Sequence, residues 1–227
     1  MDEHGHSPDD DSGHGHDASP HHGHHADRGL RGTMRYLRRL PRMWRSQTND
    51  AVVDAIAPSA GETVVDIGAG MGAAAIRAAG RGAVVVAVEP TPFMRRVLTV
   101  RRLASTARPR VDIRDGSAES LPVADGIADA VWAVNVMHHW TDWHLAVDQI
   151  ARVVAPGGRI LLVDEDFDDP AHPEHDAVRP GHRHDFDDVD VEAVGGRLGD
   201  AGFVDVDAAV THFAGRPSKL ITARRGA

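Results

Sequence analysis

The chain has 227 residues, a formal net charge of −9, no cysteine and 16 histidines. This length allows one domain, or one domain with an extension, and it is long enough to bury a sizeable core. The missing cysteines exclude disulfides, thiolate metal sites and cysteine nucleophiles, and the acidic balance argues against a protein-wide footprint for nucleic acid.

Residues 1–27 form a very polar segment with eight histidines, seven acidic residues and no lysine or arginine. Such a composition buries too little apolar surface to offset its chain entropy, so we predict a disordered tail. Its histidines can bind zinc, nickel or copper weakly, although their spacing defines no fixed coordination geometry. The possible tail ligands are His14, His16, His21, His22, His24 and His25. We predict no metal site in the rest of the chain.

Residues 28–45 reverse the charge, with seven arginines and with Leu30, Met34 and Leu37 at helical spacing. This pattern predicts a basic amphipathic helix, which covers the ligand site as a lid, lies on an anionic membrane surface or is simply solvated. No apolar run reaches the ~18 residues of a membrane span, and the acidic N-terminus does not resemble a secretory signal. We therefore expect a cytoplasmic protein without an integral membrane segment.

From residue 46 onward, apolar runs alternate with helical patterns. Ser46 or Thr48 is expected to cap a first helix that ends at Ile56. The expected strands are 63–67, 83–88, 111–113, 128–134 and 159–163, and the expected helices are 72–80, 91–105, 142–154 and 188–201. The runs 204–210 and 219–223 have no helix between them, which predicts a hairpin. The alternation predicts a doubly wound α/β fold whose sheet is mostly parallel, with helices on both faces.

The most informative segment follows the first expected strand, where Asp66 precedes Gly68, Gly70 and Gly72. Glycines permit a tight turn and a close approach of the backbone to a ligand, and the helix that follows offers unpaired N–H groups. Glu89, at the end of the second expected strand, is placed to hold a ribose. The pattern also fits a dinucleotide site, but the Asp66 carboxylate repels a pyrophosphate and attracts an ammonium or a sulfonium.

Three further segments follow in order: 88–94, 116–122 and 155–161. With the glycine loop, they make the chain resemble the class I S-adenosylmethionine-dependent methyltransferases. The resemblance spans about residues 46–227 and is greatest to the small-molecule branch, methyltransferase type 11, which is related to quinone-biosynthesis methyltransferases. It implies a Rossmann-like sheet of seven strands, S-adenosylmethionine as the cofactor and S-adenosylhomocysteine as the product.

The resemblance also implies the residues that bind the cofactor. Those residues are Asp66, Gly68, Ala69, Gly70, Gly72, Glu89, Pro90, Met94, Gly116, Ser117, Ala118, Asn135 and Val136. In the family, the acid matched by Glu89 binds the ribose hydroxyls, and segment 116–122 packs beside the adenine. The family often has aspartate where this chain has Ser117, so the serine hydroxyl, nearby backbone or Asp115 has to accept from the adenine amino group.

Methyl transfer from a sulfonium is an in-line displacement, which depends mainly on positioning, and only a nucleophile that loses a proton needs a base. The resemblance places the methyl group at the exit of the fourth strand, near Asn135. His138 and His139 are the candidate bases there, because imidazole exchanges protons near neutral pH. Alternatively, either ring is a structural histidine that bonds to the backbone. The absence of an Asn-Pro-Pro-Tyr segment argues against a nucleic-acid base as substrate.

The sequence therefore predicts an S-adenosylmethionine-dependent methyltransferase that acts on oxygen or carbon of a small molecule, with the 28–45 helix and the 164–190 loop as candidate covers of the substrate. The alternative is a non-catalytic protein that binds the cofactor and holds metal in its His-rich tail. A nicotinamide dehydrogenase is disfavoured by Asp66 and by the later segments. The sequence does not predict the oligomeric state.

Overall fold

A computed structural model describes residues 47–175 and 190–227. The predicted tail at 1–27, the predicted basic helix at 28–45 and the second half of the 164–190 loop lie outside the described residues. The described helices and strands are, in chain order, α2 (Gln47–Ile56), β1 (Thr63–Ile67), α3 (Ala73–Gly80), β2 (Val84–Val88), α4 (Pro92–Leu103), β3 (Val111–Arg114), β4 (Ala128–Val134), α5 (Trp143–Val153), β5 (Val154–Glu165), α6 (Val191–Asp200), β6 (Phe203–Phe213) and β7 (Arg216–Arg225). Two short 3₁₀ turns, η1 (Arg108–Arg110) and η2 (Met137–His139), precede β3 and follow β4.

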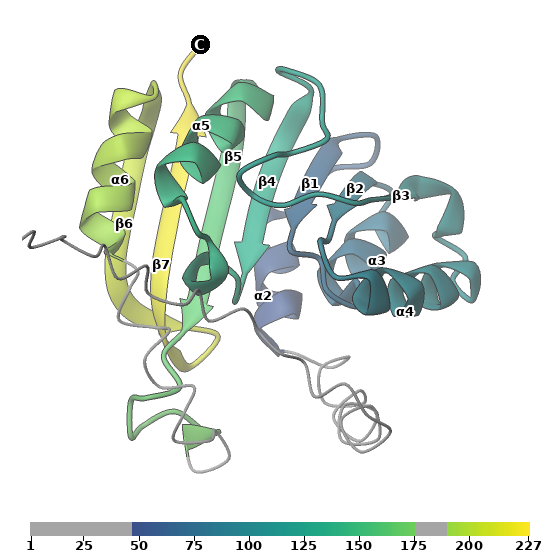
Figure 1. Ribbon diagram of the computed structural model, residues 1–227, viewed down its shortest axis with the longest axis horizontal. Helices are drawn as coiled ribbons and strands as arrows, with labels where there is room; N and C mark the ends of the chain where they lie inside the picture. Colours follow the sequence, from purple (N-terminus) through teal and green to yellow (C-terminus); the bar gives the residue numbers. More distant parts are fainter. Residues whose placement is uncertain (1–46, 176–189) are drawn as a thin grey trace, which may run out of the picture. The chain divides into compact units, whose positions relative to one another are not determined.

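The strands form one sheet of seven in the order β3-β2-β1-β4-β5-β7-β6 (Figure 1). The five strands β1 to β5 pair with one another in parallel, and β7 is antiparallel to both β5 and β6. This arrangement confirms the predicted doubly wound sheet with a C-terminal antiparallel hairpin. The strand order reverses direction between β1 and β4, and ligands of such folds bind beyond the carboxyl ends of the strands at this point.

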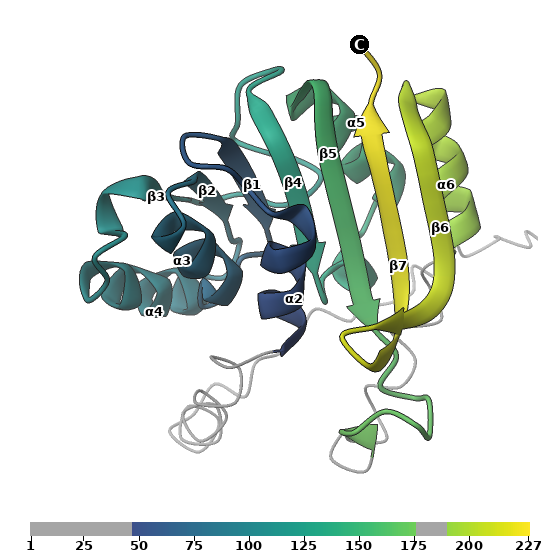
Figure 2. The same ribbon diagram turned by 180° about the vertical axis from the view of Figure 1, so that it is seen from behind.

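Helices cover both faces of the sheet. Helices α2, α3 and α4 lie on one face (Figure 2). There, α2, α3 and Leu98 of α4 pack against alternate residues of β1, β2 and β4, and the largest buried side chain is Trp132. On the other face, α5 and α6 pack against Val131, Ile160 and Leu162 (Figure 1). The connection from β3 to β4 contains no helix; instead, residues of the 115–127 segment pack into this second core.

The observed elements differ most from the predicted ones in three places, and elsewhere their ends shift by a few residues. Strand β5 begins at Val154, which already pairs with Ala128 of β4; the register then shifts, with Gly157 at φ +76°, and regular pairing resumes at Arg159. Strands β6 and β7 are longer than predicted at both ends. Of the two expected helix caps, Thr48 is wrong, since it lies inside α2 and its hydroxyl points to Glu165, and Ser46 lies outside the described residues.

Candidate functional site

The turn after β1 contains three glycines with positive φ, at +66° for Gly68, +53° for Gly70 and +74° for Gly72. A Cβ atom at Gly68 would lie 2.5 Å from Cγ1 of Val136, and one at Gly72 would collide with Leu98. A Cβ atom at Gly70 would meet nothing closer than 3.9 Å. Gly68 and Gly72 are therefore required by packing, whereas Gly70 has open space in front of its backbone.

Glu89 holds this turn from the end of β2. Its carboxylate accepts hydrogen bonds of 2.8 Å from the backbone N–H of Gly70 and from that of Thr91, and the residue is only 5% exposed. Both oxygens are thereby oriented beside the open space at Gly70. Ala69 is bonded to the same strand through its N–H to the Val88 carbonyl, at 3.0 Å.

Arg95 organises the next part of the site, close to Pro90 and Met94. Its guanidinium donates to the carbonyls of Glu89 and Pro90 and forms a two-pronged ion pair with Asp115, at 2.8 and 2.9 Å. Asp115 is therefore already engaged by Arg95. Ser117 and the neighbouring backbone are therefore the expected acceptors for the adenine amino group that are not held in an ion pair.

The 116–118 segment is a tight, partly buried turn. A Cβ atom at Gly116 would lie 2.6 Å from Cδ of Pro122, and Ala118 is buried. Glu119 links this turn to the segment after η2 by accepting from the N–H of Thr141 at 2.8 Å. Partial burial works to raise the pKa of Glu119, but hydrogen bonds from backbone N–H groups and from the Ser117 hydroxyl together lower it.

Asp66 points to the face of the sheet that carries α2 and α3, beside Trp132, its register partner on β4. The residue is 3% exposed, and neither its Oδ2 atom nor the Trp132 indole nitrogen makes a well-formed hydrogen bond. Burial raises the pKa of Asp66 to about 7; the nearby Trp132 indole opposes this rise, and the Glu89 charge adds to it. The Ala75 N–H in the first turn of α3 also works to lower the pKa of this carboxyl. A buried carboxyl with a free acceptor atom beneath the glycine turn fits a cationic ligand group.

The exit of β4 is tied to the end of β5. The Asn135 side chain donates to Oε1 of Glu165 at 2.9 Å and accepts from the Glu165 N–H at 2.8 Å, with Asn135 in the left-handed region at φ +55°. The N–H groups of Val136, Met137 and His138 all donate to the Asp164 carboxylate. Val136 also packs against Gly68, so the β4 exit and the glycine turn are in direct contact.

The two candidate bases differ in their surroundings. The His138 ring lies 2.8 Å from Asp164 through its Nδ1 atom, and its side chain is 19% exposed. His139 is exposed, and the two ring centroids are 3.9 Å apart with the planes tilted by 56°. His138 is therefore the ring that a buried acid holds in a defined orientation.

A buried polar cluster, not predicted from the sequence, lies at the same edge of the sheet. Its centre is Glu165, whose carboxylate accepts from Thr48, Asn135, His172 and Arg216 at 2.6, 2.9, 3.0 and 2.7 Å. Burial raises the pKa of Glu165, but these four donors more than offset it, so its pKa is lowered. His172 accepts from the Glu174 N–H through Nδ1, so its Nε2 atom carries the hydrogen donated to Glu165. No signal in the sequence connects such distant residues.

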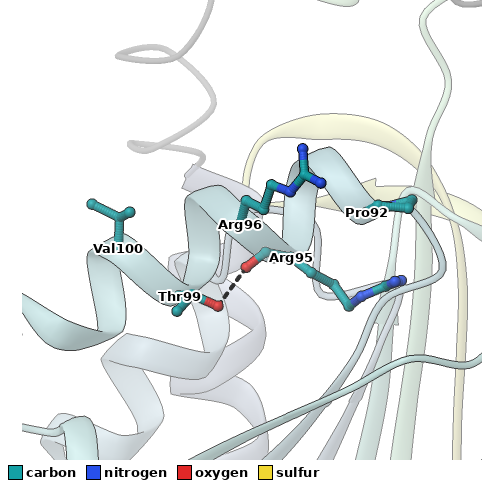
Figure 3. Close-up of a pocket in the computed structure, with 5 residues that line it drawn as sticks. All are labelled: Pro92, Arg95, Arg96, Thr99 and Val100. Atoms are coloured by element: carbon teal, nitrogen blue, oxygen red, sulfur yellow. Dashed lines mark hydrogen bonds between the residues drawn. The ribbon is translucent and has the colours of Figure 1, made fainter.

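Three further observations limit what this part of the chain can bind and where. A hollow of about 480 Å³ is lined only by residues of α4, on its outer face, and contains none of the predicted site residues (Figure 3). Among residues 47–175 and 190–227, no three histidine, aspartate or glutamate side chains are placed to hold a metal ion. In the same residues, no helix has both the length and the apolar character needed to cross a membrane.

The carboxyl edge of the sheet thus combines an open backbone at Gly70, a fixed acid at Glu89, a buried acid at Asp66 and a polar exit at β4. This chemistry fits S-adenosylmethionine, which presents an ammonium, a sulfonium and a ribose diol. A seven-stranded sheet with a glycine turn after β1 is also what the resemblance to the S-adenosylmethionine-dependent methyltransferases implies.

Comparison with known proteins agrees with this assignment. Residues 65–162 match the family model described as a methyltransferase domain. An uncharacterized methyltransferase of Mycobacterium tuberculosis is 40% identical over 111 residues, which are 49% of this chain and 43% of that protein. A demethylmenaquinone methyltransferase of Clavibacter sepedonicus is 34% identical over 140 residues, 62% of this chain and 52% of that one. The chain thus spans about half the length of the curated relatives it matches.

Among solved structures, a putative S-adenosyl-L-methionine-dependent methyltransferase from Methanococcus maripaludis superposes with a TM-score of 0.68 at 17% identity, covering 87% of this chain and 93% of that one. At this identity, the likeness concerns the fold. By sequence over residues 65–162, and by the fold, the chain is similar to the class I S-adenosylmethionine-dependent methyltransferases, which use S-adenosylmethionine as their cofactor.

Proposed function

We propose that this protein transfers the methyl group of S-adenosylmethionine to an oxygen or carbon atom of a small molecule. The observation that carries the proposal is the contact between Gly68 and Val136, because it joins the cofactor turn directly to the exit of β4. A cofactor bound at Gly70 would therefore have the β4 exit, with His138, beside it. The name of the Clavibacter sepedonicus relative supports a small molecule as the acceptor.

The proposed cofactor site uses residues from four segments. Glu89 would hold the ribose hydroxyls, since its oxygens are fixed beside Gly70. Asp66 would attract the cationic amino-acid end from beneath the turn, and Ser117 with its neighbouring backbone would face the adenine. At the β4 exit, Val136 would line the amino-acid end, while Asn135 holds the backbone there through its two bonds to Glu165.

When bound, the cofactor supplies an electrophilic methyl group, and the protein has to align the acceptor and exclude water. The acceptor would enter from the edge formed by the β4 exit, the end of β5 and the start of β7. His138 is the proposed proton acceptor at this edge, because its ring is both partly exposed and held by a buried carboxylate.

Binding and turnover test the proposal separately. Calorimetry of the full chain with S-adenosylhomocysteine should show one site per chain, which Gly70→Val should abolish because its side chain fills the open space. Asp148→Asn, on the exposed face of α5, is the matched control and should bind normally. A screen of small acceptors with labelled S-adenosylmethionine then identifies the substrate. No binding at millimolar ligand would refute the proposal, and binding without transfer to any acceptor would favour the non-catalytic alternative.

A further inference from the structure

Asp164, the penultimate residue of β5, lies directly behind the proposed reaction site. Its side chain is 1% exposed, and its carboxylate receives three consecutive backbone N–H groups from the β4 exit. Oδ1 accepts from Val136 at 2.9 Å and from Met137 at 3.2 Å, and Oδ2 accepts from His138 at 3.0 Å. These bonds alone would suffice to fix the turn, yet Oδ2 also contacts the His138 ring.

The contact between Oδ2 and Nδ1 of His138 decides which ring nitrogen carries the hydrogen. A carboxylate only accepts hydrogen bonds, so at a separation of 2.8 Å the Nδ1 atom must be the donor. A neutral imidazole carries a single hydrogen, and the Nε2 atom therefore keeps its lone pair. No described residue forms a hydrogen bond with Nε2, and the ring's other neighbour, His139, meets it with a tilted plane.

We propose that Asp164 is a positioning residue that holds His138 in the Nδ1–H tautomer, so that Nε2 accepts the proton of a hydroxyl acceptor. This inference rests on the proposed function and narrows the acceptor to a molecule with an acidic O–H group, such as a phenol or an enol. Imidazole is a suitable base for such a group near neutral pH.

The proposed step balances in atoms and charge. The acceptor oxygen forms a bond to the methyl carbon, and its proton moves to Nε2 of His138. The bond from that carbon to sulfur breaks, and its electron pair stays on the sulfur of S-adenosylhomocysteine. The imidazolium formed at His138 then lies beside the Asp164 carboxylate, which stabilises its charge. The imidazolium finally releases the Nε2 proton to solvent, which its partly exposed ring can reach.

Nitrogen-15 NMR of the imidazole rings tests the tautomer without any acceptor or cofactor. In the wild-type protein at a pH where His138 is neutral, its signals should report a protonated Nδ1 and an unprotonated Nε2; His138→Gln identifies these signals by removing them. A wild-type ring with the hydrogen on Nε2 would overturn the inference, even if Asp164 variants do not fold.

Asp164→Asn tests the function of the contact. Its amide oxygen can still accept the Val136 and Met137 N–H groups. Its NH₂ group no longer accepts the His138 backbone N–H, and it faces Nδ1, which forces the ring hydrogen onto Nε2. We expect unchanged S-adenosylhomocysteine affinity but a loss of roughly 10²–10⁴-fold in kcat on the phenol or enol acceptor identified by the screen. His144→Gln, a surface histidine stacked on Trp143, serves as the control with full activity.

The outcomes separate this inference from the proposed function. If the wild-type protein does not bind S-adenosylhomocysteine, the methyltransferase proposal itself is refuted. Normal binding with an unchanged kcat in Asp164→Asn would leave the methyltransferase intact and overturn the role given to Asp164.

Discussion

The Thr48 hydroxyl donates a 2.6 Å hydrogen bond to the Glu165 carboxylate, although the two residues are 117 positions apart in the chain. Through this bond, the first described helix is fixed to the end of strand β5. Glu165 also binds Asn135 and Arg216, so one buried carboxylate joins α2, the β4 exit and the final hairpin. Glu165 therefore links three parts of the edge where an acceptor would enter.

Loss of this carboxylate should be costly for stability. Glu165→Ala leaves the Arg216 charge and the His172 N–H without their buried partner, and breaking a buried pair in this way costs about 3–5 kcal/mol. Arg197→Ala removes an exposed ion pair with Asp148 and should cost about 1 kcal/mol or less. Urea denaturation of both variants measures the difference; equal, small losses would show that the cluster does not stabilise the fold.

The buried Asp66 should make the stability of the cofactor-free protein depend on pH. Its pKa in the folded protein, about 7, lies above the ordinary value of 3.8, so the folded state binds the proton more tightly. The resulting stabilisation is complete below about pH 4 and is lost as the pH rises through 7; a shift of this size corresponds to roughly 4 kcal/mol.

Asp66→Asn removes this titration while keeping the shape of the side chain. The free energy of unfolding of the wild type, minus that of the variant, should therefore fall between pH 4.5 and 7.5. The other shifted acids, such as Glu62 and Glu165, are common to both proteins and cancel in the difference. A difference that stays constant with pH would contradict the assignment.

Substitutions at two glycines of the turn after β1 should affect stability and cofactor binding differently. Gly68→Ala places a methyl group 2.5 Å from Val136 at a positive φ, so it should lower the free energy of unfolding by about 2–5 kcal/mol. Gly70→Ala has similar backbone strain but open space, so we expect a loss of about 1–2 kcal/mol together with weaker cofactor binding.

Val136→Ala in the Gly68→Ala background should restore part of the lost stability, because it removes the colliding methyl groups. Thermal or urea unfolding of the single and double variants measures this coupling. Purely additive effects of the two substitutions would show that the contact does not determine the cost.

Glu89 should contribute more to cofactor binding than to folding. In Glu89→Gln, the amide oxygen still accepts one of the two N–H groups, but the charged acceptor proposed for the ribose is gone. Hydrogen bonds to charged groups contribute about 1.5–3 kcal/mol, so the dissociation constant for S-adenosylhomocysteine should rise roughly 10- to 150-fold. Glu62→Gln, which disrupts an ion pair with Arg159 before β1, is the matched control and should leave affinity unchanged.

The sequence predicts the parts of this molecule that depend on local pattern. Buried strands such as 128–134 are largely apolar runs, which the sequence shows directly. The turn after β1 needs residues without a Cβ atom, so its glycines alone indicate a tight turn. The Glu165 cluster was not predictable, because its partners come from four segments and carry no common spacing. Thr48 illustrates the limit: a threonine near the start of a helix favours a cap locally, but a carboxylate 117 residues later binds its hydroxyl instead.

The position of Arg216 has a consequence for how the protein is made. Fifty-one residues separate it from Glu165, and at about 5–20 residues per second the ribosome needs several seconds to add them. During that time the nascent chain already contains the glycine turn and strands β1 to β5, but the end of β5 lacks its antiparallel neighbour and its counter-charge. The half of the molecule that would receive the acceptor is thus completed last, and a chain cut short within the final hairpin would retain the cofactor turn beside an unfinished edge.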